Sequence, residues 1–94
     1  MSFSLKFWGV RGSIACPSKD FVQFGGNTSC LEVNAGDQQI ILDAGTGIRN
    51  LGDSNVQQGV NKSTILFSHT HWDHITGFPF FTPVFNPNNE LKLM

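Results

Sequence analysis

The sequence lacks the features of membrane-spanning, secreted or strongly nucleic-acid-binding proteins. No run approaches the ~20 apolar residues of a membrane span, and the first six residues lead into a strand-like segment rather than the apolar core of a secretion signal. Lysine and arginine number 6 against 7 acidic residues, so no basic stripe is present to follow a nucleic-acid backbone. We therefore expect a cytoplasmic protein that does not bind membranes.

Cysteine content and length set two further limits. Cys16 and Cys30 are isolated thiols without metal-type spacing, so reduced structural cysteines are expected, with a disulfide as the alternative. The 94 residues contain no repeat, linker or low-complexity segment and suit one small domain. Positive charge is scarce, and Arg11 and Lys62 are candidates among the six basic residues to contact an anion.

All three histidines of the chain fall within one segment, residues 69–74, which reads His-Thr-His-Trp-Asp-His. Imidazole and carboxylate are the natural ligands of zinc and similar divalent ions. If the apolar run before the segment is a strand, His69 and His71 leave its end on the same side and can close on one metal. Asp73 and His74 follow at the start of a short helix and can face a second metal. The alternative, a polar surface loop, gives no reason for this spacing.

The rest of the pattern is rich in strands. We expect strands at residues 4–10, 30–34, 38–43 and 64–68, with a further one beginning near residue 91. In the second strand, Leu31 and Val33 share one face, which alternation predicts to be the buried one, with Glu32 on the other. Ala35-Gly36-Asp37 predicts a tight hairpin turn.

The connecting segments are less regular. Thr46 is a plausible cap for a short helix through Ile48 and Leu51, and residues 11–27 and 53–61 are expected to be loops. Trp72 is expected to pack in the core. The three phenylalanines near Pro79 are expected to wedge the histidine segment against the sheet, with an aromatic wall for a base or sugar as the alternative: Phe78, Phe80 and Phe81.

At its histidine segment the chain resembles the metallo-β-lactamase-fold hydrolases, whose signature is His-x-His-x-Asp-His at the end of a buried strand. Residues 7–14, 24–30, 40–47 and 75–81 are similar to the branch related to ribonuclease Z and to cyclic-nucleotide phosphodiesterases of the same fold. The resemblance implies an α+β fold, the N-terminal part of a four-layer αββα sandwich. That fold normally needs about 200 residues or more. Residues 1–94 are therefore expected to be the N-terminal portion of a single domain, truncated at the C-terminus.

The resemblance also implies a role for each candidate residue. His69 and His71 would bind one divalent ion, and Asp73 and His74 a second, with zinc expected and manganese as the other candidate. Asp73 would also lie beside the attacking water as the catalytic residue. Asp43 is expected to hydrogen-bond the histidine segment and fix its geometry, although a plain turn cap is the alternative.

Substrate contacts are less defined. Arg11 could reach a phosphate or be a solvated charge, and Asn27, in Gly-Gly-Asn-Thr-Ser, could face a substrate or belong to a sharp turn.

The predicted function is metal-dependent hydrolysis of phosphodiester bonds in a cyclic-nucleotide or RNA-like substrate, through hydroxide held by two metal ions. Within the enzyme class, a lactone or thioester hydrolase is the alternative, because one fold serves several substrates. Outside it, the alternative is a non-catalytic metal-binding or assembly fragment, and the isolated chain is expected to be inactive. Its apolar strands would lack covering layers, so self-association or pairing with the missing C-terminal part is expected.

Overall fold

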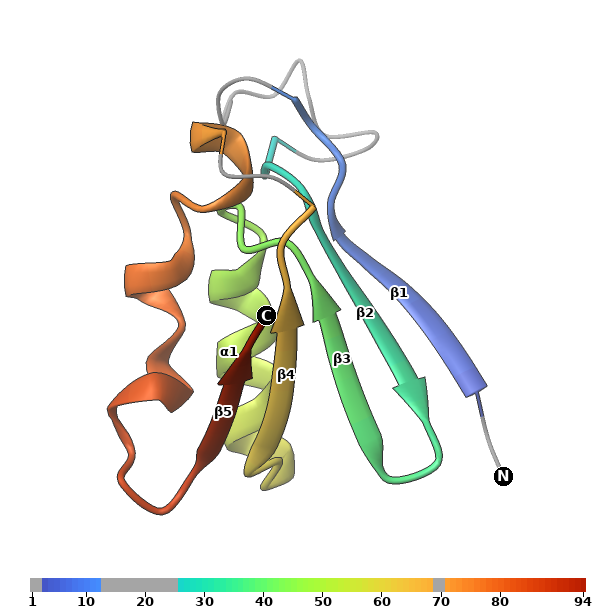
Figure 1. Ribbon diagram of the computed structural model, residues 1–94, viewed down its shortest axis with the longest axis vertical. Helices are drawn as coiled ribbons and strands as arrows, with labels where there is room; N and C mark the ends of the chain where they lie inside the picture. Colours follow the sequence, from blue (N-terminus) through green and yellow to red (C-terminus); the bar gives the residue numbers. More distant parts are fainter. Residues whose placement is uncertain (1–2, 13–25, 69–70) are drawn as a thin grey trace.

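A single mixed sheet organises the computed structural model, which describes residues 3–12, 26–68 and 71–94 (Figure 1). Its strands follow one another in chain order: β1 (Phe3–Gly9), β2 (Cys30–Ala35), β3 (Gln38–Leu42), β4 (Lys62–Leu66) and β5 (Glu90–Leu93). β1, β2 and β3 pair antiparallel, whereas β3, β4 and β5 pair parallel. The predicted strands are therefore confirmed, with bounds shifted by a few residues.

The hairpin between β2 and β3 forms where the sequence predicts it. Ala35 pairs with Gln38, which leaves a two-residue turn of Gly36 and Asp37. Gly36 has φ 64°, a left-handed conformation that glycine adopts without a steric penalty.

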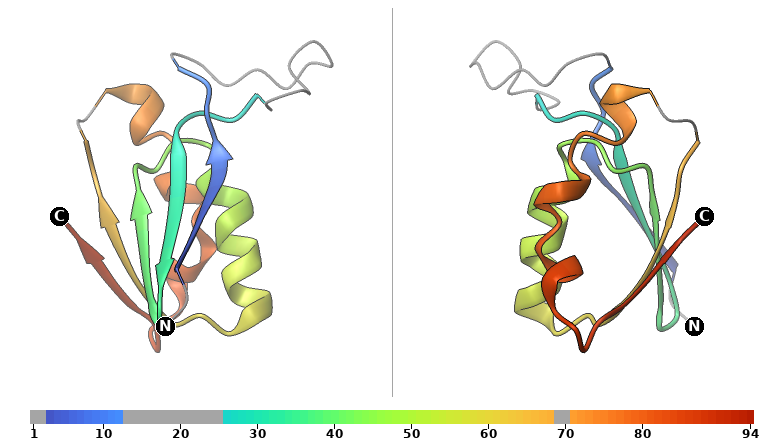
Figure 2. Two further views of the ribbon diagram at one scale, coloured as in Figure 1. Left: turned by 90° about the vertical axis from the view of Figure 1, so that its right-hand side faces the viewer. Right: turned by 60° about the vertical axis from the view of Figure 1, so that its left-hand side comes forward.

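One face of the sheet is covered by the helix α1 (Ile48–Gln58) and by three short 3₁₀ segments: η2 (Trp72–His74), η3 (Phe78–Phe80) and η4 (Thr82–Phe85). Figure 2 shows α1 and the later turns on the same side of the sheet, with the opposite side bare. The core between these layers consists of fully or almost fully buried side chains: Cys30, Ile41, Ala44, Ile48, Leu51, Ile65 and Phe81. Among the described residues, no helix has the length and apolar character needed to cross a membrane.

α1 is longer than the sequence predicts. The expectation of a loop over residues 53–61 is wrong, because the helix continues to Gln58 and ends at Gly59, which has φ 72°. Its buried stripe contains Ile48, Leu51 and the polar Asn55. Asn55 exchanges two hydrogen bonds with the Gln39 amide, at 2.8 and 2.9 Å, so its burial leaves no polar group unsatisfied. Because Asn55 is polar, the apolar periodicity of the sequence does not extend to it and predicts only the first half of α1.

The buried face of β2 is also the opposite of the predicted one. Glu32 is 8% exposed and faces α1, whereas Leu31 and Val33 are only partly buried on the bare side. Three donors surround the Glu32 carboxylate: Trp8 Nε1 at 2.9 Å, Asn34 Nδ2 at 2.8 Å and Gln39 Nε2 at 2.7 Å. Burial alone would raise the pKa of Glu32, but these hydrogen bonds and the charge of Lys6 outweigh it and hold the pKa below its ordinary value.

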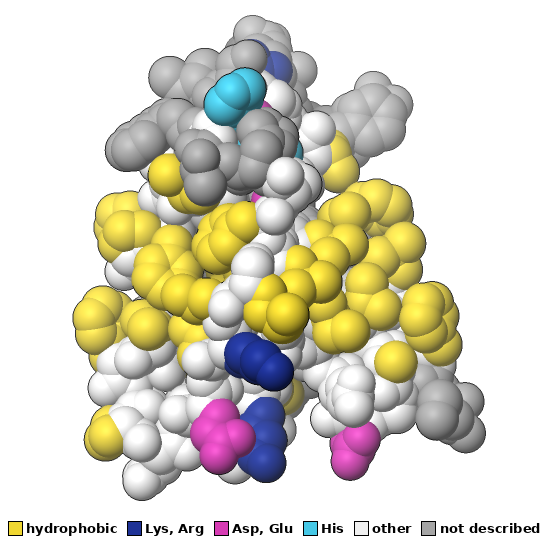
Figure 3. All heavy atoms as spheres, viewed as in Figure 1, with side chains coloured by type: hydrophobic (Ala, Val, Ile, Leu, Met, Phe, Trp, Pro, Cys, Tyr) yellow, Lys and Arg dark blue, Asp and Glu magenta, His cyan; other side chains and the backbone are white. Residues whose placement is uncertain are grey.

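The uncovered face of the sheet, here called the open face, is strongly apolar. Phe3, Leu5 and Phe7 of β1 are 73%, 50% and 62% exposed. They lie in register beside the half-buried Leu31 and Val33 of β2. Figure 3 shows hydrophobic side chains gathered in a broad band across this face. The run Ile40-Ile41-Leu42 of β3 is covered on the α1 side only.

Candidate metal centre

The candidate site lies where the parallel strands β3 and β4 end. Leu42 pairs with Leu66, so the residues after them emerge at the same edge of the sheet. Asp43 follows β3 with φ 66°, a left-handed conformation that Asp tolerates better than most residues. Its backbone N–H donates to the Leu66 carbonyl at 2.8 Å, which aims the carboxylate at the segment after β4.

The Asp43 carboxylate is 6% exposed and receives several hydrogen bonds. Ser68 donates its backbone N–H to Oδ1 and its hydroxyl to Oδ2, both at 2.8 Å. Nδ1 of His74 lies 2.9 Å from Oδ2. Burial would raise the pKa of Asp43, but the donors on Ser68 and His74 outweigh it and lower the pKa below its ordinary value.

His74 lies between two carboxylates. Its Nδ1 faces Asp43, and its Nε2 lies 3.3 Å from Oδ2 of Asp73. When the Nδ1–H group donates a hydrogen bond to Asp43, Nε2 keeps a lone pair on the side of the ring that faces the Asp73 carboxylate. An imidazole nitrogen beside a carboxylate oxygen, with the far side of the ring fixed by another carboxylate, is the donor chemistry that suits a divalent ion. His74 and Asp73 therefore supply two of the donors that such an ion needs.

The structure brings together some of the predicted ligands. Asp43, Asp73 and His74 meet in one row, whereas His71 is exposed. His69 lies outside the described residues. Within residues 3–12, 26–68 and 71–94, no three histidine, cysteine or acidic side chains are arranged to hold an ion directly. The predicted ligand set of four therefore stays a prediction.

The backbone of the segment that carries Asp73 and His74 is fixed against the turn after β3. Ala44 donates its N–H to the His74 carbonyl at 2.8 Å, and Gly77 donates to the Ala44 carbonyl at 2.9 Å. A Cβ on Gly45 would lie 2.5 Å from the Asp73 carbonyl oxygen, and one on Gly77 would overlap the carbonyl oxygen of Gly45. Because Gly45 and Gly77 have no Cβ, the two backbone segments can lie this close together. Their contact sets the positions of Asp73 and His74.

A pair of threonines, here called the threonine clasp, supports the same turn. Thr46 donates its N–H to Thr28 Oγ1 at 2.8 Å, and Thr28 donates its N–H to Thr46 Oγ1 at 2.9 Å. Thr46 is therefore not the predicted helix cap, since Gly47 occupies that position without a side-chain hydrogen bond. The clasp is not predicted from the sequence, although both threonines lie in its glycine-rich segments, residues 24–30 and 40–47.

The two candidate substrate residues lie next to this clasp. Oδ1 of Asn27 accepts a hydrogen bond from Thr46 Oγ1 at 3.2 Å. The Arg11 N–H donates to the Asn27 carbonyl at 3.0 Å, so the two residues are neighbours. Asn27 thus has a structural contact, and the substrate role of either residue stays a prediction.

The aromatic residues after the motif divide into three environments. Phe81 is 1% exposed in the core, where its Cδ1 would lie 3.0 Å from a Cβ on Gly52. Phe78 is partly buried against that core, whereas Phe80 is 59% exposed. The predicted wedge is therefore wrong for Phe80, which follows Pro79 on the outer side of η3. The side chain of Trp72 lies outside the described set.

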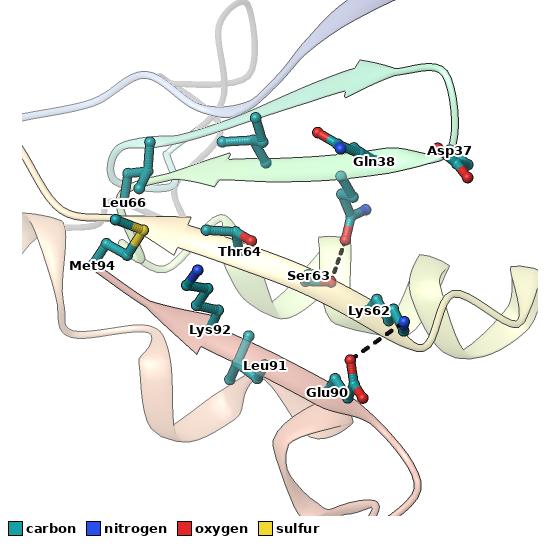
Figure 4. A pocket seen from close by; sticks show the side chains of 12 residues that line it. Asp37, Gln38, Lys62, Ser63, Thr64, Leu66, Glu90, Leu91, Lys92 and Met94 are labelled. Carbon is teal, nitrogen blue, oxygen red and sulfur yellow. Dashed lines mark hydrogen bonds and ion pairs between the residues drawn. The ribbon is translucent and has the colours of Figure 1, made fainter.

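Two of the hollows in the described part of the chain are large enough to hold a small molecule. The larger, about 880 Å³, occupies the open face along β3, β4 and β5, where Lys62 and Glu90 form an exposed ion pair at 3.5 Å (Figure 4). No described residue of the histidine segment lines it. The smaller, about 330 Å³, is apolar and borders that segment directly, through Ile75 and Thr76. Because the smaller hollow is next to the candidate ligands, it is the better candidate for a substrate pocket of this site.

Comparisons with known proteins agree with the resemblance seen in the sequence. Over 81 residues the chain is 32% identical to a ribonuclease Z of Archaeoglobus fulgidus, a match that covers 82% of this chain and 23% of the relative. No protein-family model matches the chain.

Two solved structures share its fold. A diphosphatase of the PhnP family superposes with a TM-score of 0.59 at 18% identity, over 94% of this chain and 37% of that one. A metallo-β-lactamase-type protein of Thermotoga maritima gives a TM-score of 0.52 at 23% identity, over 84% and 39%. The chain therefore has the metallo-β-lactamase fold, of which it carries the strand-rich N-terminal part. It spans less than a quarter of its curated relative and about two fifths of the solved neighbours.

Proposed function

We propose that this chain carries the metal-binding part of a hydrolase that cleaves phosphodiester bonds, such as those of a cyclic nucleotide or RNA. The observation that supports this most directly is the row Asp43–His74–Asp73, with one imidazole between two carboxylates at 2.9 and 3.3 Å. The likeness to ribonuclease Z over most of the chain supports the choice of substrate class.

The proposed site holds two divalent ions, zinc or manganese. Such ions lower the pKa of a water molecule to about 7 and neutralise charge on the phosphate oxygens. In this proposal His69 and His71 bind one ion, while His74 and Asp73 bind the other. The metal-binding fold of the relatives implies divalent ions, and the choice and number of them are part of the proposal.

Each residue of the row has a separate role in this proposal. Asp43 accepts a hydrogen bond from the Nδ1–H group of His74 and so holds the ring in the tautomer whose Nε2 can bind an ion. Asp73 presents a carboxylate oxygen on the other side of the ring and accepts a hydrogen bond from the attacking water. Ser68 orients the Asp43 carboxylate through two hydrogen bonds, so it acts on the ion only indirectly.

Zinc titration of the chain by calorimetry tests the metal site. The wild-type chain should bind zinc with micromolar or weaker affinity, because part of the usual ligand set is not among its residues. His74→Ala and Asp73→Ala should weaken binding. Asp43→Asn, which keeps the shape of the side chain, should weaken it about 10–100-fold. Asp53→Ala, which removes an exposed carboxylate of α1, is the matched control and should leave binding unchanged. Equal affinity for all these variants would contradict the proposed site.

Turnover of bis(p-nitrophenyl) phosphate with zinc or manganese tests the reaction. In the full-length protein, Asp73→Ala should lower kcat about 10²–10³-fold, because a well-placed electrostatic group acts mainly in the transition state. Asp53→Ala should retain the wild-type rate. The 94-residue chain alone should show no turnover above free metal. Hydrolysis of lactones or thioesters without phosphodiesters would overturn the substrate assignment while leaving the metal site standing.

A further inference from the structure

The smaller hollow beside the histidine segment has the size of a ligand pocket. Its volume is about 330 Å³, within the range of small-molecule sites. Its walls come from the end of β4, the segment after His74, and β5: Phe67, Ile75, Thr76, Phe78, Pro79 and Leu93. Five of these six side chains are apolar, so the hollow does not suit a phosphate or a sugar.

The shape of the walls favours a planar group. Phe67 and Phe78 contribute aromatic rings, and Pro79 adds a saturated five-membered ring. Planar heteroaromatic rings gain from contact with such faces through stacking and apolar burial. Thr76 supplies a hydroxyl that can donate to, or accept from, a ring nitrogen or carbonyl.

Residues that line the hollow are sequence neighbours of residues in the proposed metal centre. Phe67 directly precedes Ser68, whose N–H and hydroxyl bind Asp43, and Ile75 directly follows His74. The wall formed by residues 75–78 is held in place, because Gly77 donates to the Ala44 carbonyl at 2.9 Å and Phe78 donates to the Ile75 carbonyl at 3.1 Å. The hollow and the row Asp43–His74–Asp73 are thus built on adjoining residues of the same two segments.

We propose that this hollow binds the base of a nucleotide substrate, next to the phosphodiester that the metal centre cleaves. The position of the phosphate rests on the proposed function, but binding of the base depends only on the apolar walls and needs no metal. An aliphatic acyl chain is the competing occupant, and it would belong with thioester or lactone hydrolysis.

The test uses the metal-free chain in the presence of a chelator and follows the ¹³C methyl signals of Ile75, Thr76 and Leu93. Adenosine should cause saturable shifts of these signals, whereas ribose 5-phosphate, which lacks a base, should not. Shifts of equal size with ribose 5-phosphate, or tighter binding of octanoate than of adenosine, would overturn the proposal.

Two variants sharpen this test. Leu93→Phe fills the hollow and should weaken adenosine binding at least about fivefold, the lower end of what base stacking on an aromatic ring contributes. Its control is Leu5→Phe, since both leucines are 50% exposed on edge strands, but Leu5 lies on the open face. If Leu93→Phe does not fold, Phe78→Leu removes one aromatic wall and should weaken binding similarly. Unchanged adenosine affinity in a folded variant would count against the pocket. If Asp73→Ala loses zinc binding but still binds adenosine, the proposed base pocket stands.

Discussion

The two faces of the sheet are both apolar, yet they differ in what they contact. On the covered face, Ile41 and Ile65 are fully buried under α1, and Glu32 and Gln39 link the strands to Asn55 of the helix through hydrogen bonds. On the open face, Phe3 and Phe7 are largely exposed, and the described polar contacts are limited to its rim, where Lys62 pairs with Glu90.

The difference between the faces shows that hydrogen bonds fix one specific arrangement of packed elements, whereas apolar contact by itself does not. The buried polar side chains described on the covered face are all hydrogen-bonded, so the network fixes how α1 lies on β3. Ser63 extends it to β4, since its hydroxyl donates to Gln39 Oε1 at 2.6 Å. The open face has apolar area without such partners, so it can accept any sufficiently apolar surface.

Truncation of one isoleucine on each face should give the largest contrast in stability. Ile41 and Ile40 are neighbours in β3, but Ile41 is fully buried and Ile40 lies on the open face. Ile41→Ala should lower the free energy of unfolding by about 2–5 kcal/mol, because it leaves a cavity in a packed core. Ile40→Ala should cost less than half as much. Urea unfolding measures both, and equal losses would mean that the open face is packed as tightly as the covered one.

Replacement of Glu32 should have an intermediate effect and a defined pH dependence. Glu32→Gln sets an amide among three donors and should cost about 1–3 kcal/mol at pH 7, the range for an unsatisfied buried polar group. The pKa of Glu32 is lowered in the folded protein, so its contribution is complete above the ordinary carboxylate pKa and is lost as the pH falls through the folded value.

The measurement is the free energy of unfolding between pH 7 and pH 3, for wild type and Glu32→Gln. The wild type should lose more stability on acidification than the variant. Some loss should persist in the variant, because the pKa of Asp43 is lowered too. Parallel curves for the two proteins would show that Glu32 does not titrate with unfolding.

A charge on the open face should have the smallest effect on stability but should change association. Leu5→Glu should alter the free energy of unfolding by no more than about 0.5 kcal/mol, as is usual for exposed positions. The wild-type chain should self-associate through its apolar face, and this variant should reduce that association. Sedimentation over a range of concentrations measures it, with Val56→Glu, an exposed site on α1, as the control. A concentration-independent wild-type monomer would contradict the expectation.

Local signals were sufficient to predict much of the fold. Alternating apolar residues located the strands, and Gly36 located the hairpin turn. The clustering of the histidines indicated the candidate site, whereas the contact of Asp43 with the histidine segment was implied by the resemblance to the metallo-β-lactamase-fold hydrolases, with a turn cap as the alternative. The strands, the turn and the histidine cluster depend on residues close in sequence.

Other features depend on partners that are far apart in the sequence. Glu32 is buried because Trp8, 24 residues before it, and Gln39, seven after it, supply donors. Asn55 belongs to the buried stripe of α1 for the same reason, through Gln39. The threonine clasp joins two loops 18 residues apart. Apolar periodicity assigns each of these polar residues to an exposed position, so it cannot predict their hydrogen bonds.

The contact between Gly77 and Gly45 restricts how this protein can vary over evolution. Every single substitution of Gly77 adds at least a Cβ, which would overlap the Gly45 carbonyl oxygen. A substitution at Gly77 would therefore force the backbone through residues 73–77 to move, whatever substrate the protein acts on. Variation can enter instead through side chains that border the smaller hollow, such as Thr76 and Leu93. A directed-evolution library for new substrates should hold both glycines constant and randomise those bordering positions.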